Sequence, residues 1–218
     1  MDARISKPVR RPAPPQRDPE RTRAAILGAA TAEFSAKGLD GARVDEIARR
    51  SGVNKRMIYH YFGDKEGLYL AVLEASYSAI RTAELGLRLN DQHPTDGMRT
   101  LVRFTWDYFL AHPEFLSLLA TENLHRAGNL KKLRHIRELH SPLAGTLSDL
   151  LDRGAKQGLF RADVDPIQLY VSIAALGFFY LSNRHTLSTI FGHDLNAPAA
   201  LDDRGRHIVD VVLGYLRA

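Results

Sequence analysis

Residues 44–62, with the sequence VDEIARRSGVNKRMIYHYF, decide how the N-terminal part of the chain folds. Apolar residues recur at helical spacing on both sides of a Ser51-Gly52 break, which predicts two short helices joined by a tight turn. Gly52 can adopt the positive φ that such a turn requires, and Val53 can fill the angle between the helices. Asn54 follows, where its side-chain oxygen can cap the second helix. The stretch therefore predicts a helix-turn-helix.

The second of these helices turns polar side chains outward that carry donors or positive charge, namely Lys55, Arg56, Tyr59 and His60. A helix that lies in the DNA major groove needs such side chains to reach base edges and phosphates. The alternative is an ordinary solvated helix face. The helical frame around these residues favours contact with double-stranded DNA, and we expect Tyr61 and Phe62 to lie in the core instead.

The net charge of +5 is confined to the same part of the chain. Residues 1–70 contain 14 Lys or Arg and 9 Asp or Glu, whereas residues 71–218 contain 16 of each. Phosphate binding is driven by cations and by counterion release, so this asymmetry favours a nucleic-acid partner. A solubilising basic tail is the alternative interpretation of the charge alone.

Composition and motifs exclude several other classes. The chain is 44% hydrophobic and 25% charged, which is ordinary for a globular protein, and it has no cysteine for disulfides or thiolate metal sites. It lacks an apolar run of membrane-spanning length and a signal peptide, so we expect a cytoplasmic protein with no membrane partner. Phosphate-loop, zinc-protease and serine-hydrolase motifs are absent, which argues against an enzyme. The spacings of His125, His135 and His140 do not suit a metal, and we expect no metal or other cofactor.

The N-terminus divides into an arm and a first helix. Residues 1–18 are rich in Arg and Pro and are expected to be a disordered basic arm, either a flexible leader or a segment that follows DNA. Asp18-Pro19 suits a helix start, and Lys37-Gly38 suits its end. The first turn exposes Arg21 and Thr22, which we expect to meet phosphate. Residues 19–64 are therefore predicted to form the DNA-binding domain.

The pattern of residues 65–218 predicts a series of helices. We therefore expect an all-α fold with about nine helices. A long helix capped by Asp64 leads out of the first domain. Further helices are expected from a Thr95 cap to His112, from Pro113 to about residue 126, over about 129–157 with an interruption at Pro142, from Pro166 to Gly192, and after Pro198. No stretch shows sustained strand alternation. The last two helices are apolar almost all round, which predicts burial on more than one face.

Residues 22–73 resemble the TetR/AcrR family of bacterial transcriptional regulators. The resemblance is carried by Ile26-Leu27, Ala30, Phe34, Gly38, Val44, Ile47-Ala48, Ser51-Gly52-Val53, Tyr59, Tyr61-Phe62, Lys65-Glu66 and Leu68. It implies a homodimeric regulator, usually a repressor, that binds an operator and is released when a small-molecule effector enters the C-terminal domain. Two-fold symmetry would place the reading helices about 34–36 Å apart on a pseudo-palindrome.

Carried over by position, the resemblance assigns DNA contact to Asn54 and to the outward residues of the second helix, and phosphate contact to Lys65. Two positions depart from the family pattern. Arg43 stands near a place that usually carries Ser or Thr, so we expect a charge to replace a hydroxyl contact. Arg56 stands where a small or hydroxyl residue is usual, and Arg bound to guanine is the commonest specific base contact. Arg56 is therefore expected to alter the sequence that is read.

The resemblance also implies an effector pocket and a dimer interface in residues 65–218. The candidate effector contacts, on helices that line the pocket in the family, are Trp106, Phe109, Glu122, Asn123, His140, Phe178 and Asn183. For each of them the alternative to ligand contact is core packing or a surface position. The last two helices would form a four-helix bundle with a second subunit, through Ile173, Leu176, Gly177, Tyr180, Leu181, Ile208, Val212 and Tyr215. An architectural DNA-binding protein without a ligand is a rival interpretation, but the large neutral domain adds no phosphate-binding charge.

Overall fold

The structure is a computed structural model that describes residues 18–218, except for the side chains of residues 137 and 139–141. This part of the chain is helical, with two short 3-10 helices, η1 (Leu89–Asp91) and η2 (Leu130–Lys132), and no strand beyond an isolated bridge. The nine α-helices are α1 (Pro19–Gly41), α2 (Val44–Ser51), α3 (Lys55–Phe62), α4 (Lys65–Leu85), α5 (Pro94–Ala111), α6 (Pro113–Leu124), α7 (Ile136–Lys156), α8 (Pro166–Phe191) and α9 (Pro198–Leu216). The all-α prediction is confirmed, whereas the arm predicted for residues 1–18 lies, except for Asp18, outside the described residues.

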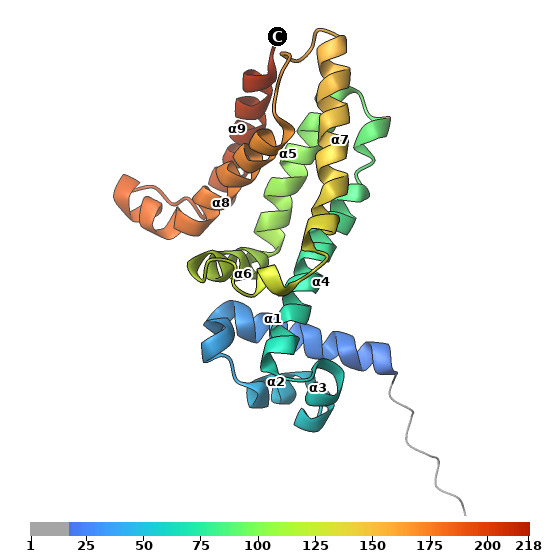
Figure 1. Cartoon of the computed structure of the whole chain (residues 1–218). Helices are drawn as coiled ribbons and strands as arrows, with labels where there is room; N and C mark the ends of the chain where they lie inside the picture. The colour runs from blue at the N-terminus through green and yellow to red at the C-terminus, as the bar shows by residue number, and fades with distance from the viewer. Residues whose placement is uncertain (1–17) are drawn as a thin grey trace, which may run out of the picture.

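Helices α1, α2 and α3 form one unit at the end of the molecule opposite the C-terminus (Figure 1). The local signals in the sequence act as predicted. The Oδ1 atom of Asn54 accepts a hydrogen bond from the backbone N–H of Arg56 at 2.9 Å, and Gly52 ends α2 with a φ of 65°. Gly38 has a φ of 67° and breaks α1 before its last turn, because glycine adopts this conformation without strain. The predicted helix-turn-helix is therefore formed by α2 and α3.

Helix α4 joins this unit to the larger bundle (Figure 1). Asp64 caps it by accepting a hydrogen bond from the backbone N–H of Gly67 at 2.7 Å. The helix belongs to two apolar clusters: Leu68 and Leu73 pack with α1–α3, whereas Tyr77 packs with the C-terminal helices. The change from one core to the other falls after Leu73, within α4.

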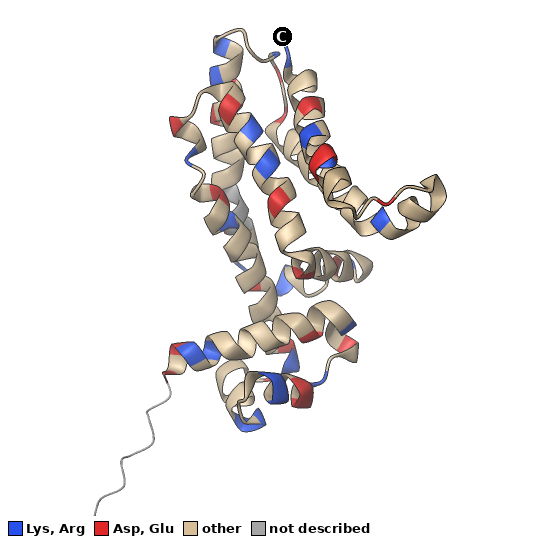
Figure 2. Cartoon of the chain, turned by 180° about the vertical axis from the view of Figure 1, so that it is seen from behind, with Lys and Arg blue, Asp and Glu red and all other residues tan. Residues whose placement is uncertain are grey.

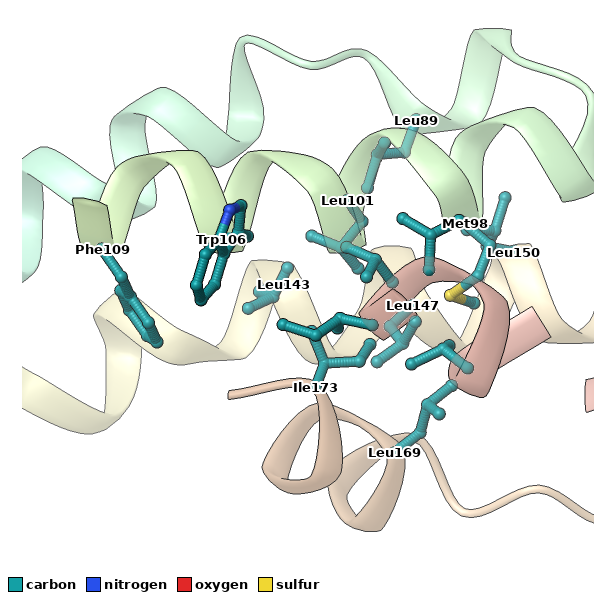
Figure 3. Close-up of a cluster of buried hydrophobic side chains, with 14 of the residues drawn as sticks. Leu89, Met98, Leu101, Trp106, Phe109, Leu143, Leu147, Leu150, Leu169 and Ile173 are labelled. Atoms are coloured by element: carbon teal, nitrogen blue, oxygen red, sulfur yellow. The ribbon is translucent and has the colours of Figure 1, made fainter. Parts of the chain in front are cut away.

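The C-terminal core is built around α5, which packs against α7, α8 and α9. Figure 3 shows labelled side chains of α5, α7 and α8 in one cluster, among them Met98, Leu150 and Ile173. Two glycines allow the aromatic rings of α5 this close approach. A Cβ on Gly205 of α9 would lie 2.9 Å from the Trp106 ring, and a Cβ on Gly177 of α8 would lie 3.2 Å from Phe109. The small residues on α8 and α9 thus set how closely these helices pack on α5.

Helix α6 makes a second connection between the two cores. It packs against α1, and its Leu118 is buried in the cluster formed by α1–α4. The Tyr69 hydroxyl of α4 donates a hydrogen bond to Oε1 of the buried Glu122 at 3.1 Å. Glu122 also accepts from Asn129 Nδ2 at 3.1 Å and from the backbone N–H of Leu130 at 2.9 Å. The carboxylate therefore fixes α4, α6 and the start of the following loop together.

Two predicted helix starts are wrong. Helix α5 begins at Pro94 rather than after a Thr95 cap. Proline suits the first helical turn, because a backbone N–H at that position has no acceptor within the helix and its absence costs nothing. Helix α7 begins at Ile136 rather than near residue 129. The chain before it is irregular, with positive φ at Arg126 and Ala127 and then η2, while Pro142 lies inside the helix instead of interrupting it.

Candidate nucleic-acid interface

The start of α2 is fixed by a buried carboxylate on α1. The side chain of Glu33 is inaccessible to solvent; its Oε1 accepts a hydrogen bond from Lys37 Nζ at 2.8 Å and one from the backbone N–H of Arg43 at 3.2 Å. Arg50 of α2 lies 3.7 Å from the other oxygen. The hydrogen bond from Lys37 is the main reason why the pKa of Glu33 is lowered. Glu33 thus positions α2, and sequence reasoning missed it.

The cations of α2 are paired with carboxylates. Glu46 accepts hydrogen bonds from Arg49 and Arg50 at 2.6–2.9 Å, and the bond from Arg49 contributes most to lowering the pKa of Glu46 to about 2. Lys55, at the start of α3, lies 2.8 Å from Asp45 across the turn. Both members of this pair are well exposed, so the pair is weak and a DNA phosphate can replace Asp45 as the partner of Lys55.

The outer face of α3 is the part of the unit that is free to contact a partner. Only Ile58 of this helix is buried. Arg56, Tyr59 and His60 are exposed, and their spacing of three and four residues places them on one face. Met57 is also exposed, at 37%, and sequence reasoning did not assign it a role. An exposed methionine beside cationic and hydroxyl groups provides an apolar contact of the kind that reads a thymine methyl group.

The remaining predicted DNA residues lie at the starts of α1, α2 and α4. Arg21 and Arg43 have exposed side chains, and the Thr22 hydroxyl donates to the backbone oxygen of Asp18 at 3.0 Å. Lys65 Nζ donates to the backbone oxygen of Asp40 at 3.1 Å, next to the turn before α2. Figure 2 shows Lys and Arg positions at the start of α1 and on α2 and α3. The unit therefore presents distributed positive charge around an exposed helix.

The residues predicted for the effector pocket are engaged in other contacts. Trp106 and Phe109 lie in the C-terminal core (Figure 3). Trp106 packs edge-on against Tyr180 with ring centroids 5.6 Å apart. Glu122 is bonded as described above. Asn123 and Asn183 each donate to a backbone oxygen of their own helix at 2.8 Å. Phe178 is half-buried against the C-terminal core, and the side chain of His140 lies outside the described residues.

The residues predicted for the dimer interface differ in exposure. Six of them are mostly covered within the single chain, although Val212 still lines a groove between α8 and α9: Ile173, Gly177, Tyr180, Leu181, Ile208 and Val212. Tyr180 packs against Trp106 of α5, and a Cβ on Gly177 would contact Phe109 of the same helix. Leu176 is partly exposed and Tyr215 is 51% exposed, so these two stay available. Other exposed apolar residues of the same two helices are Ile167, Val171, Phe179, Ile190, Phe191 and Val211.

Two family models match the chain. Residues 26–72 match the bacterial regulatory proteins of the tetR family, and residues 94–212 match the tetracyclin repressor-like C-terminal domain. The chain belongs to the TetR family. It is a DNA-binding transcriptional regulator and not an enzyme, as the sequence predicted.

Relatives and solved structures of the TetR family cover most of the chain. The HTH-type transcriptional repressor NicS of Pseudomonas putida is 43% identical over 198 residues, which span 91% of this chain and 93% of NicS. The regulator RutR of Escherichia coli K12 is 27% identical over 88% of this chain and 89% of RutR. A regulator from Streptomyces coelicolor, SCO4942, has a TM-score of 0.68 at 26% identity, over 89% of this chain and 98% of that one. AibR, solved with isovaleryl coenzyme A and operator DNA, shares the fold with a TM-score of 0.65 at 20% identity, over 88% of this chain and 97% of AibR.

No helix in the described part of the chain is long and apolar enough to cross a bilayer. The same residues contain no group of three His, Cys, Asp or Glu side chains that is placed to hold a metal ion.

Proposed function

We propose that this TetR-family chain is a cytoplasmic, homodimeric repressor that binds a pseudo-palindromic operator and is released by a small-molecule effector. The exposed face of α3 carries this proposal, because its Arg56, Tyr59 and His60 project from a helix whose other side is fixed to the core. The relationship to the repressor NicS supports repression. AibR shows that the same fold accommodates an operator and a small molecule together.

In this proposal some residues contact base edges and others contact phosphates. Arg56, Tyr59 and His60 read base edges in the major groove, with Met57 as an apolar neighbour, and Asn54 begins the reading helix. Phosphate contacts come from the surrounding cations and a hydroxyl: Arg21, Thr22, Arg43, Lys55 and Lys65. Residues 1–18 form the N-terminal arm, residues 19–64 the reading unit and residues 65–218 the effector-binding and dimerisation domain.

The second subunit covers the outer face of α8 and α9. Ile167, Val171 and Phe179 of α8 are 53–61% exposed, although they are large and apolar. Phe179 also lines a groove between α8 and α9 together with Val211 and Tyr215. Exposed apolar surface of this extent marks an interaction site, and two-fold pairing of both helices gives a four-helix bundle. The dimer then fixes the spacing of the two α3 helices.

Selection of bound fragments from a random DNA pool tests this function. The expected result is one enriched motif with two similar half-sites in inverted orientation, whose centres lie about one helical turn apart. Enrichment without a motif, or with a single half-site, would contradict the proposed reading dimer. Because an operator also locates the regulated genes, the same experiment narrows the search for the effector.

A further inference from the structure

A buried ion pair on α4 is only partly satisfied. Arg81 and Glu84 lie three residues apart, their side chains meet at 2.9 Å, and the two residues are 5% and 4% exposed. Arg81 Nη2 donates to the Tyr170 hydroxyl of α8 at 2.8 Å, and the guanidinium lies 5.4 Å from the centre of the same ring. Among the described residues, Arg81 Nε and Glu84 Oε1 have no hydrogen-bond partner. Buried groups of this kind are normally satisfied, so their presence requires an explanation.

The pair is part of the lining of a cleft between α4, η1 and α7, and we call this charged part of the lining its floor. The cleft has a volume of about 160 Å³, close to that of a cavity that holds benzene. Apolar side chains of Leu85, Leu89 and Leu143 form much of its wall. More polar or exposed residues line the rest: Arg88, Asn90, Asp91, Pro142 and Thr146. The cleft is therefore an apolar slot with a charged floor.

The floor favours an anion over a cation. Arginine stays charged at any physiological pH, whereas burial raises the pKa of Glu84 to about 7 even though the nearby Arg81 lowers it in part. Protonation of this carboxyl leaves Arg81 without a full counter-charge. A planar guanidinium binds a carboxylate through parallel hydrogen bonds, and the Nε and Nη1 atoms of Arg81 are buried donors without a hydrogen-bond partner among the described residues.

We propose that this cleft binds the effector and that the effector is a small organic carboxylate, up to about the size of a substituted benzene ring. Its carboxylate accepts hydrogen bonds from Arg81, and its apolar part lies against Leu85, Leu89 and Leu143. The release of DNA on binding rests on the proposed function, whereas the binding itself does not. The site also differs from the one implied by the family resemblance.

The position of the cleft connects it to the DNA-binding unit. Arg81 and Glu84 lie near the end of α4, and Lys65 lies in its first turn. At 1.5 Å per residue, Lys65 and Glu84 are about 29 Å apart along one continuous helix. A ligand that tightens the cleft therefore acts on the same rigid element that carries a predicted phosphate contact.

Calorimetric titration of the full-length protein without DNA tests the site. The probes are monocarboxylates from propionate to phenylacetate, each paired with its primary amide. We expect at least one carboxylate to bind, and its amide to bind at least tenfold more weakly. Absence of binding across the panel, or equal binding of the amides, would overturn the proposal.

Variants of the floor assign the binding to these side chains. Arg81→Gln is expected to weaken carboxylate binding at least tenfold, whereas Glu84→Gln should keep or strengthen it, because it removes a competing negative charge. In the double variant R81Q/E84Q both side chains are neutral and similar in size to the originals. If Arg81→Gln alone fails to fold, this variant tests whether loss of the Arg81 charge weakens carboxylate binding. Arg99→Gln, on the exposed side of α5, is the matched control. Full binding by the double variant, or loss in Glu84→Gln, would refute the assignment.

The pH dependence of binding provides a second readout. The affinity for the carboxylate should fall between pH 6 and pH 8, as Glu84 loses its proton and competes for Arg81, and it should be flat in Glu84→Gln. The tyrosines around the pair stay protonated in this range, because burial raises the pKa of each. The charged and titratable groups that interact with Arg81 or Glu84 or line the cleft are Tyr77 of α4, Tyr108 of α5, Tyr170 of α8, and Arg88 and Asp91. A flat profile in the unmodified protein would contradict the role of Glu84.

A carboxylate that binds as expected is then added to the complex of the protein with its selected DNA fragment. Release of the DNA supports the regulatory role of the cleft. Binding without release would leave the site assigned but refute its identification as the effector site.

Discussion

Arg56 lies on the exposed face of α3, and its guanidinium carries the two parallel donors that the proposed contact with a base edge requires. Replacing it with alanine should weaken operator binding by about 1–3 kcal/mol and relax the preference at one base pair in each half-site. Fluorescence anisotropy with the selected operator and with single-base variants measures both effects. Arg99→Ala, which removes an exposed arginine from the C-terminal domain, is the control. Equal loss on all DNA sequences would show that Arg56 contacts only phosphate.

Glu33 is a buried acid whose pKa is lowered in the folded state, chiefly by its hydrogen bond with Lys37. A lowered pKa means that its contribution to stability is present above the unfolded value of 4.5 and is lost as the pH falls through the folded value. Glu33→Gln should therefore cost about 1.5–3 kcal/mol at pH 7, since hydrogen bonds to a charged group are lost, and much less at pH 3. Urea unfolding at both pH values measures the difference. An equal cost at the two values would refute the electrostatic role.

Residues that act through neighbours in sequence could be predicted from the sequence, and residues that act at long range could not. Gly52, Asn54 and Asp64 follow from turn and capping rules, because their partners lie within a few positions. Glu33 depends on a backbone N–H ten residues away, and Arg81 depends on a tyrosine 89 residues away. One signal in the sequence indicates the role of Glu33. This acidic residue lies between Ala30 and Phe34, in the stripe of residues that faces the core.

At the scale of elements, α6 connects the two cores through one buried leucine and one carboxylate. Leu118→Ala should destabilise the α1–α4 unit by about 2–5 kcal/mol, because it leaves a cavity in that cluster while α5–α9 keep their own core. Hydrogen exchange should therefore accelerate in α1–α3 more than in α5. Leu124→Ala, at an exposed position of the same helix, is the control. Uniform acceleration throughout the chain would show that the two cores unfold as one unit.

The elements themselves differ in how well the sequence predicts them. Proline and capping signals locate the starts of α1, α6 and α8, and Gly192 locates the end of α8. The start of α7 was missed because residues 129–135 contain no glycine or proline that would distinguish an irregular path from a helix. The outer face of α8 was also missed. When almost every position of a helix is apolar, the sequence shows that two faces are buried. It does not show which face packs on α5 and which face is proposed to contact a second subunit.

At the scale of the whole molecule, dimerisation should depend on the outward residues of α8. Phe179→Glu places two charges in the proposed interface, one from each subunit, and should yield a folded monomer that binds the operator at least tenfold more weakly. Analytical ultracentrifugation and circular dichroism measure the assembly and the fold. Leu124→Glu introduces the same charge at an exposed leucine of α6 and should leave the dimer intact. A dimeric Phe179→Glu variant would place the interface elsewhere.

The uncovered apolar face of α8 and α9 has a consequence for gene control. Each chain holds a single reading helix, so an operator with two half-sites is occupied well only after two chains have met. Wherever the monomer predominates, dimer concentration grows with the square of the amount of protein, and halving gene dosage lowers it about fourfold. The same surface that hides hydrophobic side chains thereby turns a proportional change in synthesis into a steeper change in transcription.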